Sequence, residues 1–175
     1  MGWRDAWSGC TLSASHSARG TTPMLRIGLI SDTHGLLRPE VKHTLGGVSH
    51  IVHAGDVGTP AVLAQLAELA PVHAVRGNND RGAWARRLPL TTSLELEGVG
   101  IFVLHDLNEL DLDPVATGLA VIVTGHSHRP RIERRDGVLY VNPGSAGPRR
   151  FSLPVTVGLL EVGAGAARAR IEPLR

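Results

Sequence analysis

Residues 24–35 read MLRIGLISDTHG, an aliphatic run that ends abruptly in small and polar residues. A short, continuously apolar run bounded by turn residues is typical of a buried β-strand, so residues 24–31 are predicted to form one. The polar tail then places Asp32 and His34 at the carboxyl end of that strand. A buried strand that ends in Asp, His or Gly is a pattern that the rest of the chain repeats.

Downstream of this stretch, helical and strand patterns alternate. The elements expected after the first strand are a helix at 38–46, a strand at 49–54, a helix at 60–69 and a strand at 72–76. Pro60 suits the first position of the second helix, and Thr59 is its candidate N-cap. A βαβαβ order predicts parallel strands joined by crossover helices.

Strand patterns dominate the second half of the chain. The expected elements are strands at 88–97 and 99–105 joined at Gly98, a short helix at 113–118, and strands at 119–124, 131–135, 138–141, 154–162 and 166–172. Asp136-Gly137 between two of these strands is a strong hairpin signal. The whole pattern predicts an α/β fold with two stacked sheets and helices outside, an αββα sandwich.

Residues 1–23 differ from the remainder, because they are rich in Ser, Thr and Gly and show neither helical nor strand periodicity. We expect this segment to be a disordered N-terminal extension and residues 24–175 to form a single domain. The abrupt start of the apolar run at Met24 suggests the hypothesis that Met24 is the natural start.

Composition and charge narrow the class of protein. The formal net charge is +2, Lys42 is the only lysine, and no long basic run occurs, so nucleic acid is not the expected partner. Cys10 is the only cysteine, which excludes an intramolecular disulfide and fits a reducing compartment. No stretch approaches the length of a bilayer span. We therefore expect a cytoplasmic protein that does not engage membranes.

Chemically reactive side chains follow one predicted strand after another. These groups are 31–35, Gly55-Asp56, Gly77-Asn78-Asn79-Asp80, His105-Asp106 and Gly125-His126-Ser127-His128. Since the carboxyl ends of the strands in an open α/β sheet line one crevice, five separate loops would deliver Asp, His and Asn to one place.

The residue types in these loops suit a metal centre. Imidazole and carboxylate together favour manganese, iron, zinc or nickel. Asp32-x-His34 and His126-x-His128 are period-two pairs at strand ends, where both members can converge on one ion. One shared carboxylate can bridge two ions about 3.5–4 Å apart, the spacing used in two-metal hydrolysis. A strand-end Asp alone is often a turn residue, so the hypothesis depends on all five groups together.

In this order, Asp32-x-His34, Gly55-Asp56, Gly77-Asn78-x-Asp80, His105 and Gly125-His126-x-His128 resemble the motifs of the calcineurin-like metallophosphoesterases. The short spacing and Asn142-Pro143-Gly144-Ser145 are similar to the small prokaryotic YfcE-like phosphodiesterase branch. The metallophosphoesterase-like subunit of the eukaryotic retromer shares the fold of that branch. The resemblance extends over residues 24–172.

This resemblance implies two divalent ions, with manganese the expected metal and nickel, zinc or iron the alternatives. The implied ligands are Asp32, His34 and His128 for the first ion, Asn78, His105 and His126 for the second, and Asp56 as the bridge. A hydroxide between the ions would attack phosphorus in line with the leaving oxygen. The residues to which the resemblance assigns catalytic roles are Asp56, Asn78, Asp80 and His105, with Asp80 fixing a loop or a neighbouring group.

Two positions depart from the family pattern. Many members carry a His after the Asn of the third motif, and that His protonates the leaving group, whereas this chain has Asn79. An amide is no general acid, so we expect activity to favour good leaving groups such as nitrophenolate and to be low on alkyl phosphates. Asp106 stands where relatives commonly have Gly, and it would either crowd the site or hold His105.

These features favour a phosphodiesterase that hydrolyses a small phosphorylated or nucleotide substrate. The alternative is a protein-interaction scaffold of the same fold with weak or vestigial activity. All seven ligand positions are filled, which favours the enzyme, while Asn79 keeps the scaffold open. A nuclease is disfavoured by the absence of a basic stripe. Exposed sheet edges would favour a homodimer or homotetramer.

Other polar residues are assigned by position alone. Arg149 and Arg150 either reach a substrate phosphate or are solvated. Trp84, with the arginines that follow it, would line the pocket. His53 is expected to be an ordinary strand residue rather than a ligand.

Overall fold

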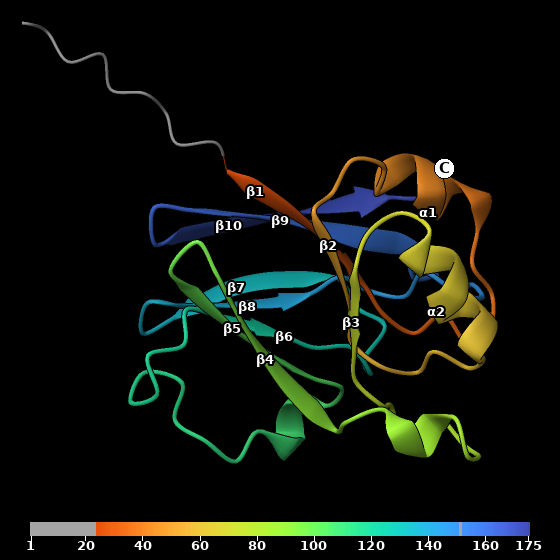
Figure 1. Ribbon diagram of the computed structural model, residues 1–175, viewed down its shortest axis with the longest axis horizontal. Helices are drawn as coiled ribbons and strands as arrows, with labels where there is room; N and C mark the ends of the chain where they lie inside the picture. Colours follow the sequence, from red (N-terminus) through yellow and green to blue (C-terminus); the bar gives the residue numbers. More distant parts are fainter. Residues whose placement is uncertain (1–23, 151) are drawn as a thin grey trace, which may run out of the picture.

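The computed structural model describes residues 24–150 and 152–175, so the predicted extension at 1–23 lies outside the described residues (Figure 1). The elements in chain order are β1 (Leu25–Ile30), α1 (Pro39–Thr44), β2 (His50–His53), α2 (Pro60–Ala67), β3 (Val72–Ala74), η1 (Ala85–Arg87), β4 (Thr91–Leu96), β5 (Val99–Leu104), η2 (Leu107–Glu109), β6 (Val121–Val123), β7 (Arg131–Arg135), β8 (Val138–Asn142), β9 (Thr156–Gly163) and β10 (Ala166–Pro173).

Within the described residues, the strands form two mixed sheets of five strands each. The first sheet has the order β10-β9-β1-β2-β3, and the second has the order β4-β5-β6-β8-β7. β1, β2 and β3 are parallel, as the βαβαβ pattern predicts, and β5, β6 and β8 are parallel in the second sheet. All the strands that precede reactive residues therefore belong to the parallel part of a sheet, and their carboxyl ends point the same way within it.

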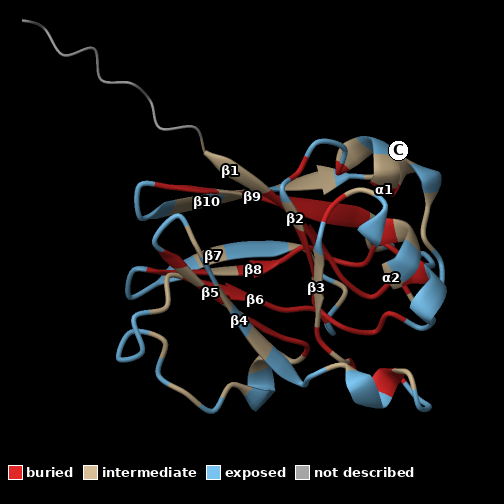
Figure 2. Cartoon of the chain, viewed as in Figure 1, coloured by how far each residue is buried: buried red, intermediate tan, exposed pale blue. Residues whose placement is uncertain are grey.

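The main core lies between the two sheets. Ile27 and Val52 of the first sheet pack in one buried cluster with Ile101 and Val123 of the second. A second buried cluster joins the other face of the first sheet to α1 and α2, which lie together on that side of the molecule (Figures 1 and 2). The predicted two-sheet α/β sandwich is confirmed.

The hairpin turn predicted at Asp136-Gly137 is present, and the N-cap predicted at Thr59 is present in position only. Asp136 and Gly137 have φ of 48° and 85°, and two positive φ values are what a type I′ hairpin turn requires. Thr59 occupies the N-cap position of α2, but its side chain makes no capping hydrogen bond. The hairpin prediction is confirmed. Thr59 is the N-cap residue, as predicted, but it does not cap the helix with its side chain.

The predicted helix at 113–118 is wrong. The segment forms a single turn, in which the Asp113 carboxylate accepts hydrogen bonds from the backbone N–H groups of Val115 and Ala116. Gly118, at φ 72°, then closes the turn, with Gly118 N–H donating to the Val115 carbonyl and Leu119 N–H donating to the Pro114 carbonyl. This is a Schellman ending, which stops the helix before a second turn can form.

The segment between β5 and β6 covers part of the outer face of the second sheet. Leu107 and Leu119 pack against Leu104, Ile122 and Val138 on this face. On β7 of the same sheet, Arg131 and Arg135 are exposed and Glu133 is partly exposed. Among the described residues, no helix is both long and apolar enough to cross a bilayer.

Candidate metal centre

The backbone is strained at most of the predicted ligands. In the part of the chain that the structure describes, the non-glycine residues with positive φ are three hairpin-turn residues, Glu97, Asp136 and Ala164, and five predicted ligands, Asp32, His34, Asp56, His126 and His128. Such a conformation costs a non-glycine residue roughly 1–3 kcal/mol, and it persists only where the surrounding structure enforces it. The tertiary structure thus holds these five side chains, which follow strands of both sheets, against their local preference.

Asp32, His34 and His128 form the first ligand group. One potential ligand atom from each lies within 4.8 Å of the other two. His128 Nε2 lies 3.3 Å from Asp32 Oδ1, and the rings of His34 and His128 stack with centroids 5.4 Å apart. The other carboxylate oxygen, Asp32 Oδ2, accepts hydrogen bonds from the Ser31 hydroxyl and from the His126 backbone N–H. The carboxylate is therefore fixed through Oδ2, and Oδ1 faces the two imidazoles.

Asn78, His105 and His126 form the second ligand group. Asn78 Oδ1 lies 3.0 Å from His105 Nε2 and 3.1 Å from His126 Nδ1, and the two imidazole rings meet edge to face. His105 Nδ1 lies 2.7 Å from the Ala54 carbonyl oxygen, which can only accept, so Nδ1 carries the proton. That hydrogen bond leaves Nε2 to face Asn78, and outer partners of this kind orient metal-binding histidines.

Asp56 lies between the two groups. Its Oδ2 is 3.8 Å from His34 Nε2 and 3.5 Å from His105 Nε2. Asp32 also reaches both sides, because its ligand atom lies within 4.8 Å of those of Asp56 and His105. Two buried carboxylates thus each lie near histidines of both groups.

The electrostatics of the centre suit cation binding. Burial raises the pKa of Asp56, but hydrogen bonds from His105 and Asn79 outweigh burial, so the pKa of this carboxyl lies well below its usual range. Burial disfavours the charged form of His34 and so lowers the pKa of that histidine, although the negative charges of Asp56 and Asp32 oppose this effect. The pKa of His105 is raised, because its hydrogen bonds to Asp56 and to the Ala54 carbonyl overcome the opposing effect of burial. The Asp56 carboxylate is therefore ionised at neutral pH and can bind a cation without losing a proton first.

Two potential ligand atoms are buried without a hydrogen-bond partner among the described residues, and this indicates whether the site fits a metal ion. Asp32 Oδ1 and His34 Nε2 are buried and have no hydrogen-bond partner within residues 24–150 and 152–175. Each unsatisfied buried polar atom costs free energy, so such atoms are rare unless something else satisfies them. Both atoms are oxygen or imidazole donors of the kind that divalent transition ions accept. The residues present therefore fit a divalent cation.

Two glycines allow the ligand loops to approach one another closely. A Cβ on Gly77 would lie 2.2 Å from the Asp56 backbone nitrogen and from Asp56 Oδ1. A Cβ on Gly125 would collide with the Ser31 hydroxyl and would lie 2.9 Å from Asp32 Oδ2. These are contacts that no other residue permits without moving a ligand.

Two further side chains tie the loops together. Asp80 accepts hydrogen bonds from the Gly58 and Gly77 backbone N–H groups, at 2.8 and 2.9 Å, and so joins the loops that follow β2 and β3. Asn142 donates to the Gly125 carbonyl at 2.6 Å and so holds the loop that carries His126. Asp80 thus fixes two ligand loops relative to each other. The loop at 142–145 supports the centre through the contact of Asn142 with Gly125.

The two departures from the family pattern have defined contacts. Asn79 Nδ2 donates to Asp56 Oδ2 at 2.6 Å, and the Asn79 backbone N–H donates to Asp56 Oδ1 at 2.8 Å. Asp106 lies against His126 rather than His105, with its Oδ2 3.6 Å from His126 Nε2. Its other oxygen accepts from the backbone and side chain of Asn108. Of the two alternatives for Asp106, a contact with His105 is not what the structure shows, and crowding of the site stays a prediction.

Three further side chains have defined positions. Trp84 packs against the core on the helix side of the first sheet instead of lining the centre. Arg150 lies near enough to His34 for its positive charge to contribute to the lowered pKa of that histidine, behind burial and against the two carboxylates. Arg76 was missed, although its place directly before Gly77 was a signal. It lines a cleft of about 290 Å³, the inner cleft, with Asn78, Asp80, His105 and His126.

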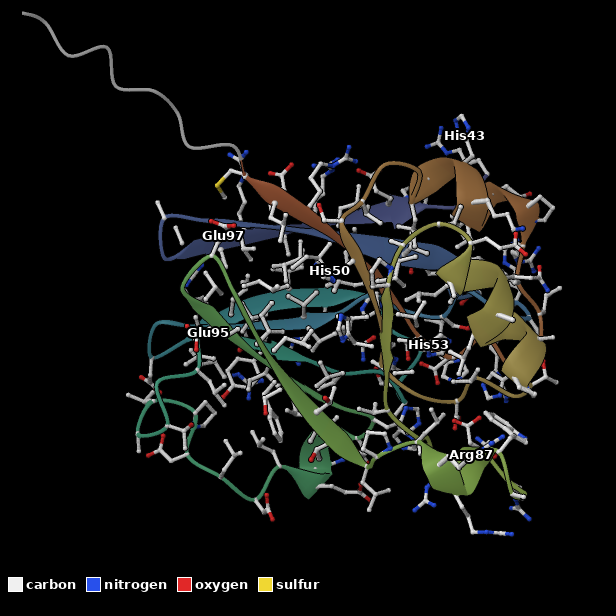
Figure 3. The ribbon with its side chains drawn as sticks, in the orientation of Figure 1. His43, His50, His53, Arg87, Glu95 and Glu97 are labelled. Atoms are coloured by element: carbon white, nitrogen blue, oxygen red, sulfur yellow. The ribbon has the colours of Figure 1, made fainter. Side chains whose placement is uncertain are left out.

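His53 is a supporting residue beneath the ligands. It is fully buried at the end of β2, in the interior, whereas the exposed His43 points outward from α1 (Figure 3). The Thr33 hydroxyl donates to the Val57 carbonyl and lies 2.9 Å from His53 Nε2, so His53 is the donor in that contact. Burial lowers the pKa of His53 to about 4, which keeps the ring neutral at neutral pH.

The calcineurin-like phosphoesterase superfamily domain matches residues 25–165, which include every ligand described above. The chain belongs to the calcineurin-like phosphoesterase superfamily. The predicted family is therefore confirmed.

Relatives within this superfamily are similar over most of their length. The probable metallophosphoesterase of Methanothermobacter thermautotrophicus is 34% identical over 140 residues, which are 73% of this chain and 81% of the relative. Phosphodiesterase YfcE of Escherichia coli K12 is 31% identical over 163 residues, which are 79% of this chain and 88% of the relative. Vacuolar protein sorting 29 of Cryptosporidium parvum has the same fold, with a TM-score of 0.71 and 17% identity over 86% of this chain and 98% of that chain.

Proposed function

We propose that this calcineurin-like phosphoesterase is a metal-dependent phosphodiesterase that holds two divalent ions and hydrolyses small phosphodiesters. The observation that carries the proposal is the meeting of two ligand groups at Asp56, whose Oδ2 lies 3.8 Å from His34 Nε2 and 3.5 Å from His105 Nε2. Two divalent ions would supply a nucleophile at neutral pH and positive charge for the phosphoryl oxygens.

The protein's own residues prepare this site. Asp56 is ionised at neutral pH, because hydrogen bonds lower its pKa against the effect of burial, and it therefore needs no deprotonation to bind a cation. The raised pKa of His105 has the opposite consequence, since a proton on Nε2 competes with a metal ion. We therefore expect the affinity for divalent ions to fall as the pH is lowered through the range in which His105 takes up a proton.

Asn79 limits the range of esters. Its side-chain amide donates a hydrogen bond to Asp56 Oδ2, but an amide N–H is too weak an acid to protonate a departing alkoxide. General acid catalysis contributes about 10²–10⁴ to the rate of such reactions, so esters with stable leaving groups are the expected substrates. The complete ligand set favours this enzyme over an interaction scaffold of the same fold.

The test is hydrolysis of bis(p-nitrophenyl) phosphate with manganese, nickel or zinc, and with a chelator. Outer partners of a metal ligand are worth about 10–100-fold in activity, so Asp56→Asn, which alters a shared ligand, should lower the rate by more than about 100-fold. Asp113→Asn is the matched control, because Asp113 lies in the exposed turn after η2. Equal residual activity in wild type and Asp56→Asn would remove the proposal.

A further inference from the structure

A second cleft of about 310 Å³ opens beside the metal centre, on the outer face of the second sheet. Its walls include Arg131, Glu133, Arg135 and Tyr140 from β7 and β8, and we call it the outer cleft. His126 and Asp106 line both the outer cleft and the inner cleft, so the two clefts adjoin at a predicted metal ligand.

Strand register explains why these side chains share one face. Glu133 pairs with Tyr140 across the antiparallel β7–β8 ladder, and Arg131 pairs with Asn142. Directly paired residues project from the same side of a sheet, and alternate residues along a strand do too. Tyr140 packs beside the outer-face cluster, so the row from Arg131 to Arg135 lies on that outer face as well. In this row Arg131 and Arg135 are exposed, and Glu133 is partly exposed.

The walls combine an aromatic ring with an excess of positive charge. The Arg135 guanidinium carbon lies 5.0 Å from the centroid of the Tyr140 ring, at cation–π distance. Glu133 Oε2 lies 2.6 Å from Arg131 and 2.9 Å from Arg135, so one carboxylate serves two guanidinium groups. Arg129 adds a further positive charge to the lining, and Asp106 a negative one. Flat guanidinium and phenol groups are surfaces on which planar rings stack.

We propose that the outer cleft binds the nucleoside of a nucleoside phosphodiester whose phosphate lies at the metal centre. This inference rests on the proposed function. A planar base would stack against the Tyr140 and Arg135 wall, and the guanidinium groups would donate to its carbonyl oxygens and ring nitrogens. The volume is at the lower end of the range of small-molecule sites, about 300–1,000 Å³. His126, common to both clefts, places the scissile phosphate between base and metal.

Two esters with one leaving group test this inference. Thymidine 5′-(p-nitrophenyl phosphate) and methyl p-nitrophenyl phosphate both release nitrophenolate, so they differ only in the group that would enter the outer cleft. With the manganese-loaded protein, kcat/KM should be about tenfold or more higher for the thymidine ester, because base stacking favours binding. Tyr140→Ala and Arg131→Ala should bring the ratio close to one without lowering turnover of the methyl ester.

Arg168→Ala is the matched control. Arg168 and Arg170 share Glu161 on the first sheet, which repeats the arrangement of two arginines around one glutamate away from the outer cleft. This variant should keep the wild-type ratio. Circular dichroism and thermal melting of all three variants would establish that each is folded.

Two results would overturn the inference: a wild-type ratio near one, or a ratio that survives both cleft substitutions. Absence of metal-dependent hydrolysis of either ester would instead count against the proposed function. Calorimetric binding of thymidine 5′-monophosphate to the manganese-loaded protein then decides the matter without turnover. Binding that Tyr140→Ala weakens about tenfold would support the outer cleft, whereas absent or unaltered binding would contradict it.

Discussion

Among single residues, Asn79 has the clearest consequence for the chemistry of this site. It donates from both its backbone and its side chain to the two oxygens of Asp56, at 2.8 and 2.6 Å. The side chain therefore stabilises the shared carboxylate and offers no acidic proton. The family resemblance implies a histidine at this position in many members, where this chain has an amide.

The variant Asn79→His is expected to widen the range of leaving groups. An imidazolium beside the phosphate would protonate a departing alkoxide, and the rate on alkyl phosphodiesters should rise by about 10²-fold or more, while nitrophenyl esters change little. The measurement is the dependence of log kcat on leaving-group pKa, which should become shallower. Asn79→Ala serves as the control, and a slope that is the same in all three proteins would contradict the prediction.

At the scale of elements, the centre depends on how the loops after β2 and β3 are joined. Asp80 is 7% exposed and accepts one backbone N–H from each loop, Gly58 and Gly77. Because the loop after β2 carries Asp56 and the loop after β3 carries Asn78, one carboxylate couples a ligand of the shared position to a ligand of the second group.

We expect Asp80→Ala to weaken metal binding as well as folding. Leaving buried backbone donors without a partner costs about 1–3 kcal/mol each, and the freed loops should lower manganese affinity by about 10–100-fold. Isothermal titration calorimetry and urea unfolding of the metal-free protein would measure the two effects.

The matched control for Asp80 is Asp113→Ala. Asp113 also accepts two backbone N–H groups, but in an exposed turn remote from the ligands. This variant should leave manganese affinity unchanged. If Asp80→Ala binds manganese as tightly as Asp113→Ala, then Asp80 has no part in positioning the loops.

For the molecule as a whole, a buried histidine links stability to pH. Burial lowers the pKa of His53 from 6.5 to about 4. Between these values the unfolded chain binds a proton that the folded protein excludes, so the contribution of His53 to stability is complete above pH 6.5 and is lost as the pH falls toward 4. For these two values the free energy of unfolding should fall by about 2 kcal/mol from pH 7 to pH 5.

The test compares urea unfolding of wild type and His53→Gln at pH 7 and pH 5, in the presence of a chelator. The variant should show a smaller difference between the two pH values, even if it is less stable at both. His43→Gln is the control, since His43 is exposed on α1 (Figure 3). An equal pH difference in wild type and His53→Gln would show that His53 does not carry this dependence.

Local sequence patterns were sufficient to predict most of the strands and turns. Apolar runs and glycine-containing turns predicted the strands, because burial and positive φ are properties that a short segment expresses by itself. The helix predicted at 113–118 failed, since Pro114 and the flanking Asp113 and Gly118 permit one turn but close it before a second. The bounds of some strands also differ from the predicted ones. The strand predicted at 88–97 begins only at Thr91, because the chain leaves η1 at Arg87 and needs the next residues to reach the sheet.

Sequence alone determined which residues stand at the ends of the strands and that they are Asp, His and Asn, because strand ends follow from local hydrophobicity and residue identity is given. The tertiary structure decided that Asp56 lies between two ligand groups, that Asp106 faces His126, and that the outer cleft adjoins the centre. These facts depend on distances between loops separated by tens of residues, and only the packing of two sheets and the strained turns between them fixes such distances.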